Sequence, residues 1–556
     1  AFACCALLAG SVGLSACSQP TGSETTPAPS ASAAAPATAA TAAATASADI
    51  KDNPFYSAST LPFQAPPFDK IKDSDYQPAI EEGMRQQQAE VEKIADSSEP
   101  PTFENTIVPM EKSGQMLYRV MNAFSAVAGA NTDHTLQKIQ ETEAPKLAAH
   151  QDAIYLNAKL FERIQALYDK RDSLKLDPES RRLLEVKYRQ FVHAGANLSD
   201  ADKAKLRQIN QQDASLETEF QQRLIAGSKA AAFVTADKAD LAGLSDAEID
   251  AAAKAAQDRN LPGQYLIPQQ NTTQQPVLAE LTDRAVREKI YDNSITRNEK
   301  GDGNDTRAII RQLAQLRAEK AGLLGYPNYA AYVLYDQMAQ TPEAVESFIN
   351  KLVPATAARI ADESRQIQAM IDRSGPHFDL QPWDWEMYSD KVRKAKYDLD
   401  QNALKPYFEL NKVLQDGVFY AANQLYGVTF KERHDIPVYQ PDVRVFDVFD
   451  KDGSQLGMIY FDYFKRDNKS GGAWMSNFVG QSKLLGTKPV IYNVANFTKP
   501  APGQPALLSF DDVTTMFHEF GHALHGLFAN QTYPLVSGTN TARDWVEFPS
   551  QFNEHW

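Results

Sequence analysis

Two histidines and a glutamate lie close together in the run FHEFGHALHGLF, residues 517–528. His518 and His522 are spaced by four, so one helical turn places both imidazoles on the same side of a helix, where they can reach one tetrahedral ion. Glu519 flanks them and can approach a water molecule on that ion. This HExxH arrangement predicts a metal site. The alternative is that two histidines and a glutamate share a helix by chance.

The residue types define the chemistry that such a site would perform. Two neutral imidazoles and one carboxylate leave a Zn²⁺ site with a net positive charge, which lowers the pKa of bound water to about 7 and polarises a peptide carbonyl. Glu519 could accept the proton of that water as a general base and pass it to the leaving amine. We therefore predict a single Zn²⁺ in each chain.

A third protein ligand is needed, and the acidic candidates downstream are Asp544, Glu547 and Glu554. Spacing alone does not choose among them, because Glu547 could equally complete a capping box with Asp544 at the start of the next helix. His525 is also open: it lies three residues after His522, so it could approach the metal, support a ligand or simply be packed.

The elements that must position these residues are strands followed by a helix. The segments VRVFDVFD, LGMIYFDYF and PVIYNVANF, between residues 441 and 497, are rich in β-branched and aromatic residues, which predicts a small sheet. Directly after it, a helix is predicted to begin near Ser509, with Asp512 completing a capping box. A sheet edge beside this helix could bind an extended peptide as one more strand.

From about residue 74 to 425 the pattern is helical, so we expect a mainly α fold. In 199–225 the apolar residues recur at the spacing of one helix face, and Ser199 or Asp200 is the start signal. The irregular lengths of the helical segments argue against a regular solenoid. Similar amphipathic stretches run near residues 134–168, 179–193, 304–323 and 342–373.

The N-terminal segments differ from the rest in composition. Residues 1–17 read as a truncated signal peptide of the lipoprotein type, and the four residues ending at Cys17 resemble a bacterial lipobox, which predicts lipidation of that cysteine. An ordinary cleaved signal or a membrane anchor are the alternatives, although the apolar run is shorter than the roughly 20 residues of a span. Residues 18–52 are rich in Ala, Ser, Thr and Pro, which predicts a disordered linker.

Composition excludes several classes of function. The formal net charge is -15, which argues against a nucleic-acid-binding surface or a basic membrane-surface protein. All three cysteines precede residue 18, so a thiol nucleophile, a disulfide and a cysteine metal site are excluded from the region 53–556. We expect a partner that is neutral, mixed or cationic.

Seven runs, spread over residues 53–556, carry a family resemblance. They are FHEFGHALHGLF, SGTNTARDWVEFPSQFNEHW, STLPFQAPPFDKI, PYFELNKVLQDGVF, DIPVYQPDVRVFDVFD, KSGGAWMSNFVGQS and PVIYNVANFTKPA. These runs resemble the thimet oligopeptidase and neurolysin family of zinc metallopeptidases, specifically its bacterial peptidyl-dipeptidase (dipeptidyl carboxypeptidase) branch. The resemblance implies that His518, His522 and Glu547 bind zinc and that Glu519 is the general base.

The resemblance also implies a fold and an activity. The fold would be mainly helical, with two lobes flanking a deep substrate channel and the small sheet next to the HExxH helix. The activity would be release of dipeptides from the free C-termini of short peptides. An endopeptidase of the oligopeptidase A type, or a non-catalytic peptide-binding lipoprotein, are the alternatives.

Two further expectations concern the ends of the chain and its surroundings. Family members continue past the position of Trp556, so we expect the zincin-type peptidase region 53–556 to be incomplete at its C-terminus and less active than the full-length protein. We expect a monomer on the periplasmic side of a bacterial cell envelope. Lipidated Cys17 would tether it to the outer membrane.

Overall fold

The computed structural model describes residues 49–269, 275–375, 377–399 and 401–556. The predicted signal peptide, with Cys17, and most of the predicted linker lie outside these residues. Helices account for most of the described chain, and a five-stranded sheet and a two-stranded ribbon complete it. The prediction of a mainly α fold with a small sheet is therefore confirmed.

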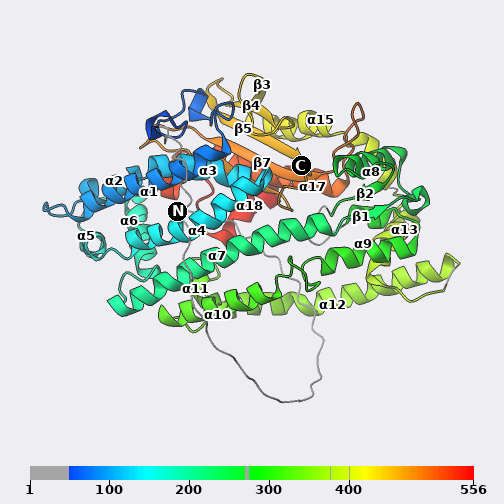
Figure 1. Cartoon of the computed structure of the whole chain (residues 1–556), viewed down its shortest axis with the longest axis horizontal. Coiled ribbons are helices and arrows are strands. Elements are labelled where there is room, and N and C mark those ends of the chain that lie inside the picture. Colours follow the sequence, from blue (N-terminus) through cyan, green and yellow to red (C-terminus); the bar gives the residue numbers. More distant parts are fainter. Residues whose placement is uncertain (1–48, 270–274, 376, 400) are drawn as a thin grey trace, which may run out of the picture.

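Helices form the larger set of elements (Figure 1). They are α1 (Asp73–Ala95), α2 (Val108–Lys112), α3 (Gln115–Ala130), α4 (His134–Tyr155), α5 (Ala158–Asp169), α6 (Pro178–His193), α7 (Asp200–Ala230), α8 (Asp246–Asp258), α9 (Arg284–Thr296), α10 (Arg307–Leu323), α11 (Tyr329–Val333), α12 (Pro342–Arg373), α13 (Trp385–Tyr397), α14 (Gln401–Leu404), α15 (Leu410–Lys412), α16 (Tyr420–Tyr426), α17 (Phe510–Leu527) and α18 (Arg543–Asn553). The strands are β1 (Phe233–Thr235), β2 (Tyr265–Ile267), β3 (Thr429–Arg433), β4 (Arg444–Phe449), β5 (Gln455–Phe464), β6 (Trp474–Val479) and β7 (Val490–Phe497).

Helix boundaries follow the capping residues. α7 begins at Asp200 and Ser199 is its N-cap, as predicted. The stretch 134–168 is two helices rather than one, because the side chain of Asn157 caps a new helix, α5, after α4 has ended. Within the described ranges, no helix has both the length and the apolar character that a membrane span requires.

The larger sheet has the strand order β3-β4-β5-β7-β6, and only the β5–β7 pair is parallel. The sequence predicted β4, β5 and β7 but did not single out β3 or β6. β6 carries the polar residues Ser476 and Asn477 at its centre, so it lacks the apolar run by which its neighbours are recognised. It forms one edge of the sheet.

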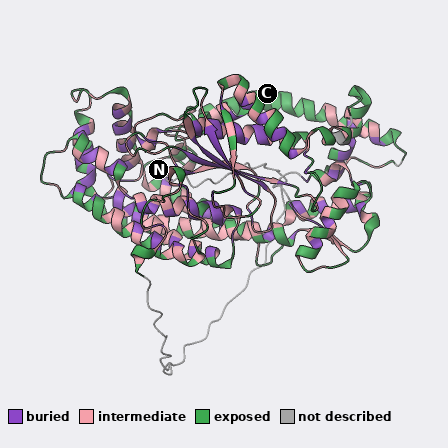
Figure 2. Cartoon of the chain, turned by 90° about the horizontal axis from the view of Figure 1, so that it is seen from above, coloured by how far each residue is buried: buried purple, intermediate pink, exposed green. Residues whose placement is uncertain are grey.

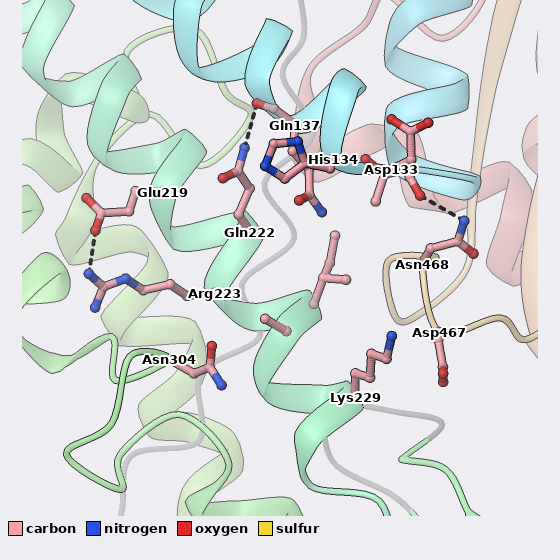
Figure 3. Close-up of a pocket in the computed structure, with 13 residues that line it drawn as sticks. Asp133, His134, Gln137, Glu219, Gln222, Arg223, Lys229, Asn304, Asp467 and Asn468 are labelled. Atoms are coloured by element: carbon pink, nitrogen blue, oxygen red, sulfur yellow. Dashed lines mark hydrogen bonds and ion pairs between the residues drawn. The ribbon is translucent and has the colours of Figure 1, made fainter. Parts of the chain in front are cut away.

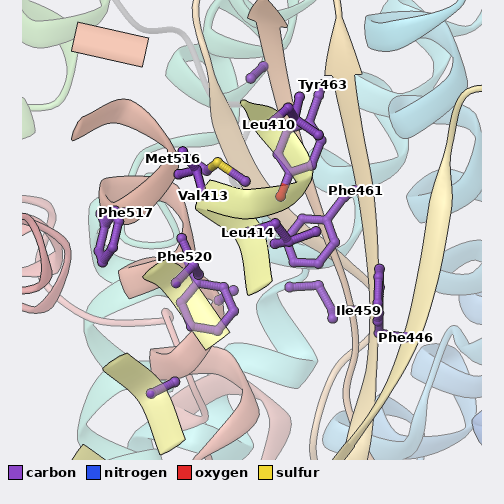
Figure 4. Close-up of a cluster of buried hydrophobic side chains, with 14 of the residues drawn as sticks. Leu410, Val413, Leu414, Phe446, Ile459, Phe461, Tyr463, Met516, Phe517 and Phe520 are labelled. Atoms are coloured by element: carbon purple, nitrogen blue, oxygen red, sulfur yellow. The ribbon is translucent and has the colours of Figure 1, made fainter. Parts of the chain in front are cut away.

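Alternate residues of β5 enter two different cores, because successive side chains of a strand point to opposite faces. Ile459, Phe461 and Tyr463 belong to the cluster that α17 covers (Figure 4). Met458 and Tyr460 belong to the cluster on the other face, which includes alanines of α3. The sheet is thus covered by helices on both sides.

α17 packs on the sheet through its apolar face. Met516, Phe517 and Phe520 belong to the buried cluster that the helix shares with the strands and the segment 410–419 (Figure 4), and Phe520 is 1% exposed. Burial of one such side chain contributes roughly 1.5–3 kcal/mol. The predicted capping box of Ser509 and Asp512 is present at the start of the helix. Core packing and capping together hold α17 in place.

Long helices form a further layer on the other side of α17 and α18 from the sheet. Figure 1 shows α7, α10 and α12 running along this layer, and α7 contacts both α4 and α10. Buried residues gather in the sheet and the helices next to it, whereas the outer helices carry exposed faces (Figure 2). In α12 all residues from 346 to 361 are exposed.

Candidate metal centre

His518 and His522 lie side by side on the face of α17 that is turned away from the sheet. Their ring centroids are 5.0 Å apart. Both side chains are half-buried, at 24% and 12% exposed. The sheet-facing residues of the helix therefore leave the two imidazoles free to face α18.

Glu547, on α18, brings a carboxylate between the two rings. Its Oε2 atom lies 3.1 Å from Nε2 of His518 and 3.1 Å from Nε2 of His522. One ligand atom from each of these three residues lies within 4.8 Å of the others. The structure thus brings together two ligands predicted from one helix and a third from the next.

The donor set fits Zn²⁺. Two imidazole nitrogens and a carboxylate oxygen, with one position left open, are the usual ligands of a hydrolytic zinc site. Tetrahedral ligands at 2.0–2.1 Å from Zn²⁺ lie about 3.3 Å from one another, which is close to the spacing of the oxygen and the two nitrogens. These three residues could therefore hold the metal with little movement.

Glu554 lies behind His518 rather than in the group of three. The Nδ1–H of His518 donates to Oε1 of Glu554 over 2.7 Å, which leaves Nε2 as the nitrogen that can bind a metal. The sequence offered Glu554 only as a candidate ligand. Its spacing of seven from Glu547 places both carboxylates on one face of α18, and this spacing is the signal that could have indicated a shared site.

The structure separates the remaining candidates from the metal group. Asp544 accepts hydrogen bonds from the backbone of residues 338 and 339 instead. The alternative that Asp544 and Glu547 form a capping box is wrong, because α18 begins after Ala542 without any side-chain cap. His525 is half-buried, its Nδ1 has no hydrogen-bond partner among the described residues, and burial lowers its pKa.

Glu519 is buried beside the two histidines, at 8% exposed. Within the described structure its Oε2 atom has no hydrogen-bond partner. Burial, reinforced by the charge of Glu547, raises the pKa of Glu519 to about 8. A buried carboxyl without a partner is costly to fold and is typical of functional sites, where a cation or a substrate completes it.

Polar and close contacts attach α18 to α17. Asn553 Nδ2 donates to the backbone oxygen of Phe517 over 2.6 Å, which joins α18 to α17. Within α18, Ser550 Oγ donates to Glu547 Oε2 over 3.0 Å. Gly521 permits the close approach, because a Cβ atom there would lie 2.7 Å from Ser550 Cα. No sequence motif marks these supporting residues, so their role follows only from the structure.

A hollow of about 540 Å³ lies elsewhere, between α4, α7 and the loop at residues 467–468 (Figure 3). Its walls mix acids and bases, such as Asp133, Glu219 and Arg223. Many of these groups already serve the fold: Gln222, for example, donates to the backbone oxygen of Gln137 across the hollow. The hollow does not include the metal group, and the deep channel expected from the resemblance stays a prediction.

The site has two histidines one helical turn apart, a buried glutamate between them and a carboxylate from a second helix. This arrangement is typical of metal-dependent peptidases. Residues 277–556 match peptidase family M3. The chain belongs to this family, and the predicted family resemblance is confirmed.

Individual relatives agree with the family assignment. The chain is 55% identical over 504 residues to dipeptidyl carboxypeptidase from Escherichia coli (strain K12). The aligned residues make up 91% of this chain and 74% of the relative. The Salmonella typhimurium dipeptidyl carboxypeptidase is 53% identical with the same coverage. Oligopeptidase A from Escherichia coli (strain K12) is 31% identical over 89% of this chain and 74% of the relative.

Proposed function

We propose that this protein is a zinc-dependent peptidyl-dipeptidase that hydrolyses oligopeptides and releases dipeptides from their free C-termini. The convergence of His518, His522 and Glu547 beside buried Glu519 supports a hydrolytic metal site. The identity of 55% to a dipeptidyl carboxypeptidase supports this branch of the family over the oligopeptidase A branch, at 31%.

The residues of the chain have distinct tasks in this reaction. Bound Zn²⁺ would supply Lewis acidity, which polarises a peptide carbonyl and acidifies water. Glu519 takes up the proton of the attacking water at Oε2, which has no hydrogen-bond partner among the described residues, and delivers it to the amine that leaves as the peptide C–N bond breaks. Glu554 keeps the proton of His518 on Nδ1, so that Nε2 stays available to the metal.

The edge strand β6 offers a place for the peptide backbone. It pairs with β7 on one side and ends the sheet on the other, and α17 packs against it. An extended peptide that added to this edge would lie beside the HExxH helix, held by main-chain hydrogen bonds that do not depend on its sequence. This arrangement suits an enzyme that accepts many short peptides.

Mass spectrometry of digestion products tests the proposal. The full-length enzyme, loaded with Zn²⁺, is incubated with an unmodified peptide and with the same peptide amidated at its C-terminus. We expect stepwise loss of dipeptides from the free acid and much slower cleavage of the amide. Equal rates on both peptides would contradict dipeptide release. The proposal also expects one zinc per chain. Protein without bound zinc would contradict the hydrolytic site and favour a peptide-binding protein.

We also propose that Cys17 is acylated and tethers the peptidase to the outer membrane, on the periplasmic side of a bacterial envelope. The lipobox-like run that ends at Cys17 and the Ala/Ser/Thr/Pro-rich residues after it support this proposal. Mass spectrometry of the mature N-terminus is the test. An unmodified cysteine, or a mature protein that starts after it, would refute the tether.

A further inference from the structure

A segment from the outer helical layer is fastened to the first turn of α18. The two carboxylate oxygens of Asp544 accept the backbone N–H groups of Met338 and Ala339, each over 2.9 Å. In the reverse direction, Gln337 Oε1 accepts the backbone N–H of Arg543 over 2.7 Å. Three hydrogen bonds thus join residues 337–339, here called the clamp segment, to the helix that carries Glu547.

These contacts replace the usual means of fixing a helix start. Ala542, the N-cap of α18, supplies no side-chain hydrogen bond. Apolar burial does not hold the clamp segment either, because Met338 is 63% exposed. Hydrogen bonds to an ionised carboxylate are stronger than neutral ones, so Asp544 provides the principal restraint between the two segments.

The clamp segment is itself anchored to α6. The ring of His193, at the end of α6, is stacked between Tyr332 and Tyr335, with centroid distances of 3.9 and 3.6 Å. His193 Nδ1 is also hydrogen-bonded to the hydroxyl of Tyr326 over 3.2 Å. A well-packed aromatic cluster therefore fixes the chain only a few residues before the clamp segment.

We propose that Asp544 is a positioning residue for the third metal ligand. Glu547 follows Asp544 by three residues, so it lies one turn further along on the same side of α18, next to the turn at which an uncapped helix frays first. When the clamp is intact, the first turn of α18 has one position, and Glu547 Oε2 stays between the two histidines. When the clamp is lost, the first turn loosens and the ligand geometry degrades. This inference rests on the metal site of the proposed function.

Zinc affinity of the full-length protein tests this role. Asp544→Ala removes both acceptors, Asp544→Asn keeps one, and Gln337→Ala removes the reverse bond. Asp246→Ala is the matched control, since it removes an exposed carboxylate from the first turn of a distant helix, α8. Competition with a chromophoric chelator gives the zinc dissociation constant, the absorption spectrum of the Co²⁺-substituted protein reports ligand geometry, and steady-state kinetics give kcat and KM at saturating Zn²⁺.

We expect Asp544→Ala to bind zinc about 10-fold more weakly, at the lower end of effects seen for residues that support metal ligands. Asp544→Asn and Gln337→Ala should show smaller losses in the same direction. The Co²⁺ spectrum should change and kcat should fall while KM stays the same. Asp246→Ala should match the wild type in every measurement.

Unchanged zinc affinity and an unchanged Co²⁺ spectrum in Asp544→Ala would overturn the proposal, even if the melting temperature fell, because the residue would then be structural only. If Asp544→Ala does not fold, the same result in Asp544→Asn and Gln337→Ala would overturn it. A wild-type protein that binds no zinc would instead refute the proposed function, so the two failures are distinguishable.

Discussion

The two helices that meet at the metal centre are held in place by different means. α17 has 18 residues, begins with a capping box and buries an apolar face against the sheet. α18 has 11 residues, begins without a side-chain cap and exposes the aromatic residues Trp545, Phe548 and Phe552. α17 supplies both histidines, whereas α18 supplies only Glu547.

This difference indicates which substitutions would displace the metal ligands. The two imidazoles are placed by a helix that is part of a hydrophobic core, so only large losses of packing would move them. The carboxylate is placed by a few hydrogen bonds and one close approach at Gly521. We therefore expect small changes around α18 to act on metal binding, and changes within the α17 core to act on stability.

The largest effect is expected at the buried carboxyl between the histidines. Glu519→Gln removes the group that carries the proton, so kcat should fall by roughly 10²- to 10⁴-fold, while zinc stays bound at unit stoichiometry. Peptide turnover and metal analysis of the same sample measure both. Turnover within a few-fold of the wild type would show that another group is the base.

A matched pair of phenylalanines compares the two helices directly. In the described chain Phe520 is 1% exposed on α17, whereas Phe548 is 59% exposed on α18. Phe520→Ala should lower the free energy of unfolding by about 3–5 kcal/mol, because it leaves a cavity beneath the helix. Phe548→Ala should change it by less than about 1 kcal/mol. Urea denaturation of this chain measures both, and equal losses would break the contrast between the helices.

Removal of the charge behind His518 should weaken zinc binding. Glu554→Gln replaces the carboxylate that accepts the Nδ1 proton, and loss of such a partner typically costs 10- to 100-fold in metal affinity. Asp511→Asn is the control, since it removes a charge from the exposed start of α17, about two helical turns before His518. Chelator competition measures both variants. An equal effect of both would indicate general electrostatics and not a specific partner.

The smallest effect is expected where α17 and α18 touch. In Gly521→Ala the new methyl group would lie 2.7 Å from Ser550 Cα, so α18 must move outward, at a cost of about 1–3 kcal/mol in stability and with weaker zinc binding. Gly526→Ala is the control, because the atoms nearest to its methyl group belong to the side chains of Met475 and Ile491 on the sheet. Calorimetry and zinc titration compare the two. Weaker zinc binding in the control alone would reverse the interpretation.

Local features of the sequence were sufficient for much of the fold. The start of α7 at Ser199, the capping box at Ser509 and the apolar strands β4, β5 and β7 follow from residue types and spacing. β6 was missed because its polar centre carries no strand signal of its own and pairing with β7 makes it a strand. The predicted helical stretch 134–168 is divided into two helices by the N-cap at Asn157. This cap was missed because it is a weaker signal than the apolar periodicity around it.

At the candidate site, the sequence by itself determined that His518, Glu519 and His522 share one part of a helix, because helical geometry relates residues four apart without help from the rest of the chain. It named Glu547 among three acids, and only the resemblance preferred it. The tertiary structure decided which acid lies between the histidines, which lies behind His518 and which is held by the outer helical layer. Those positions depend on how α18 packs on α17, and contacts between segments far apart in the chain have no periodicity by which a sequence could reveal them.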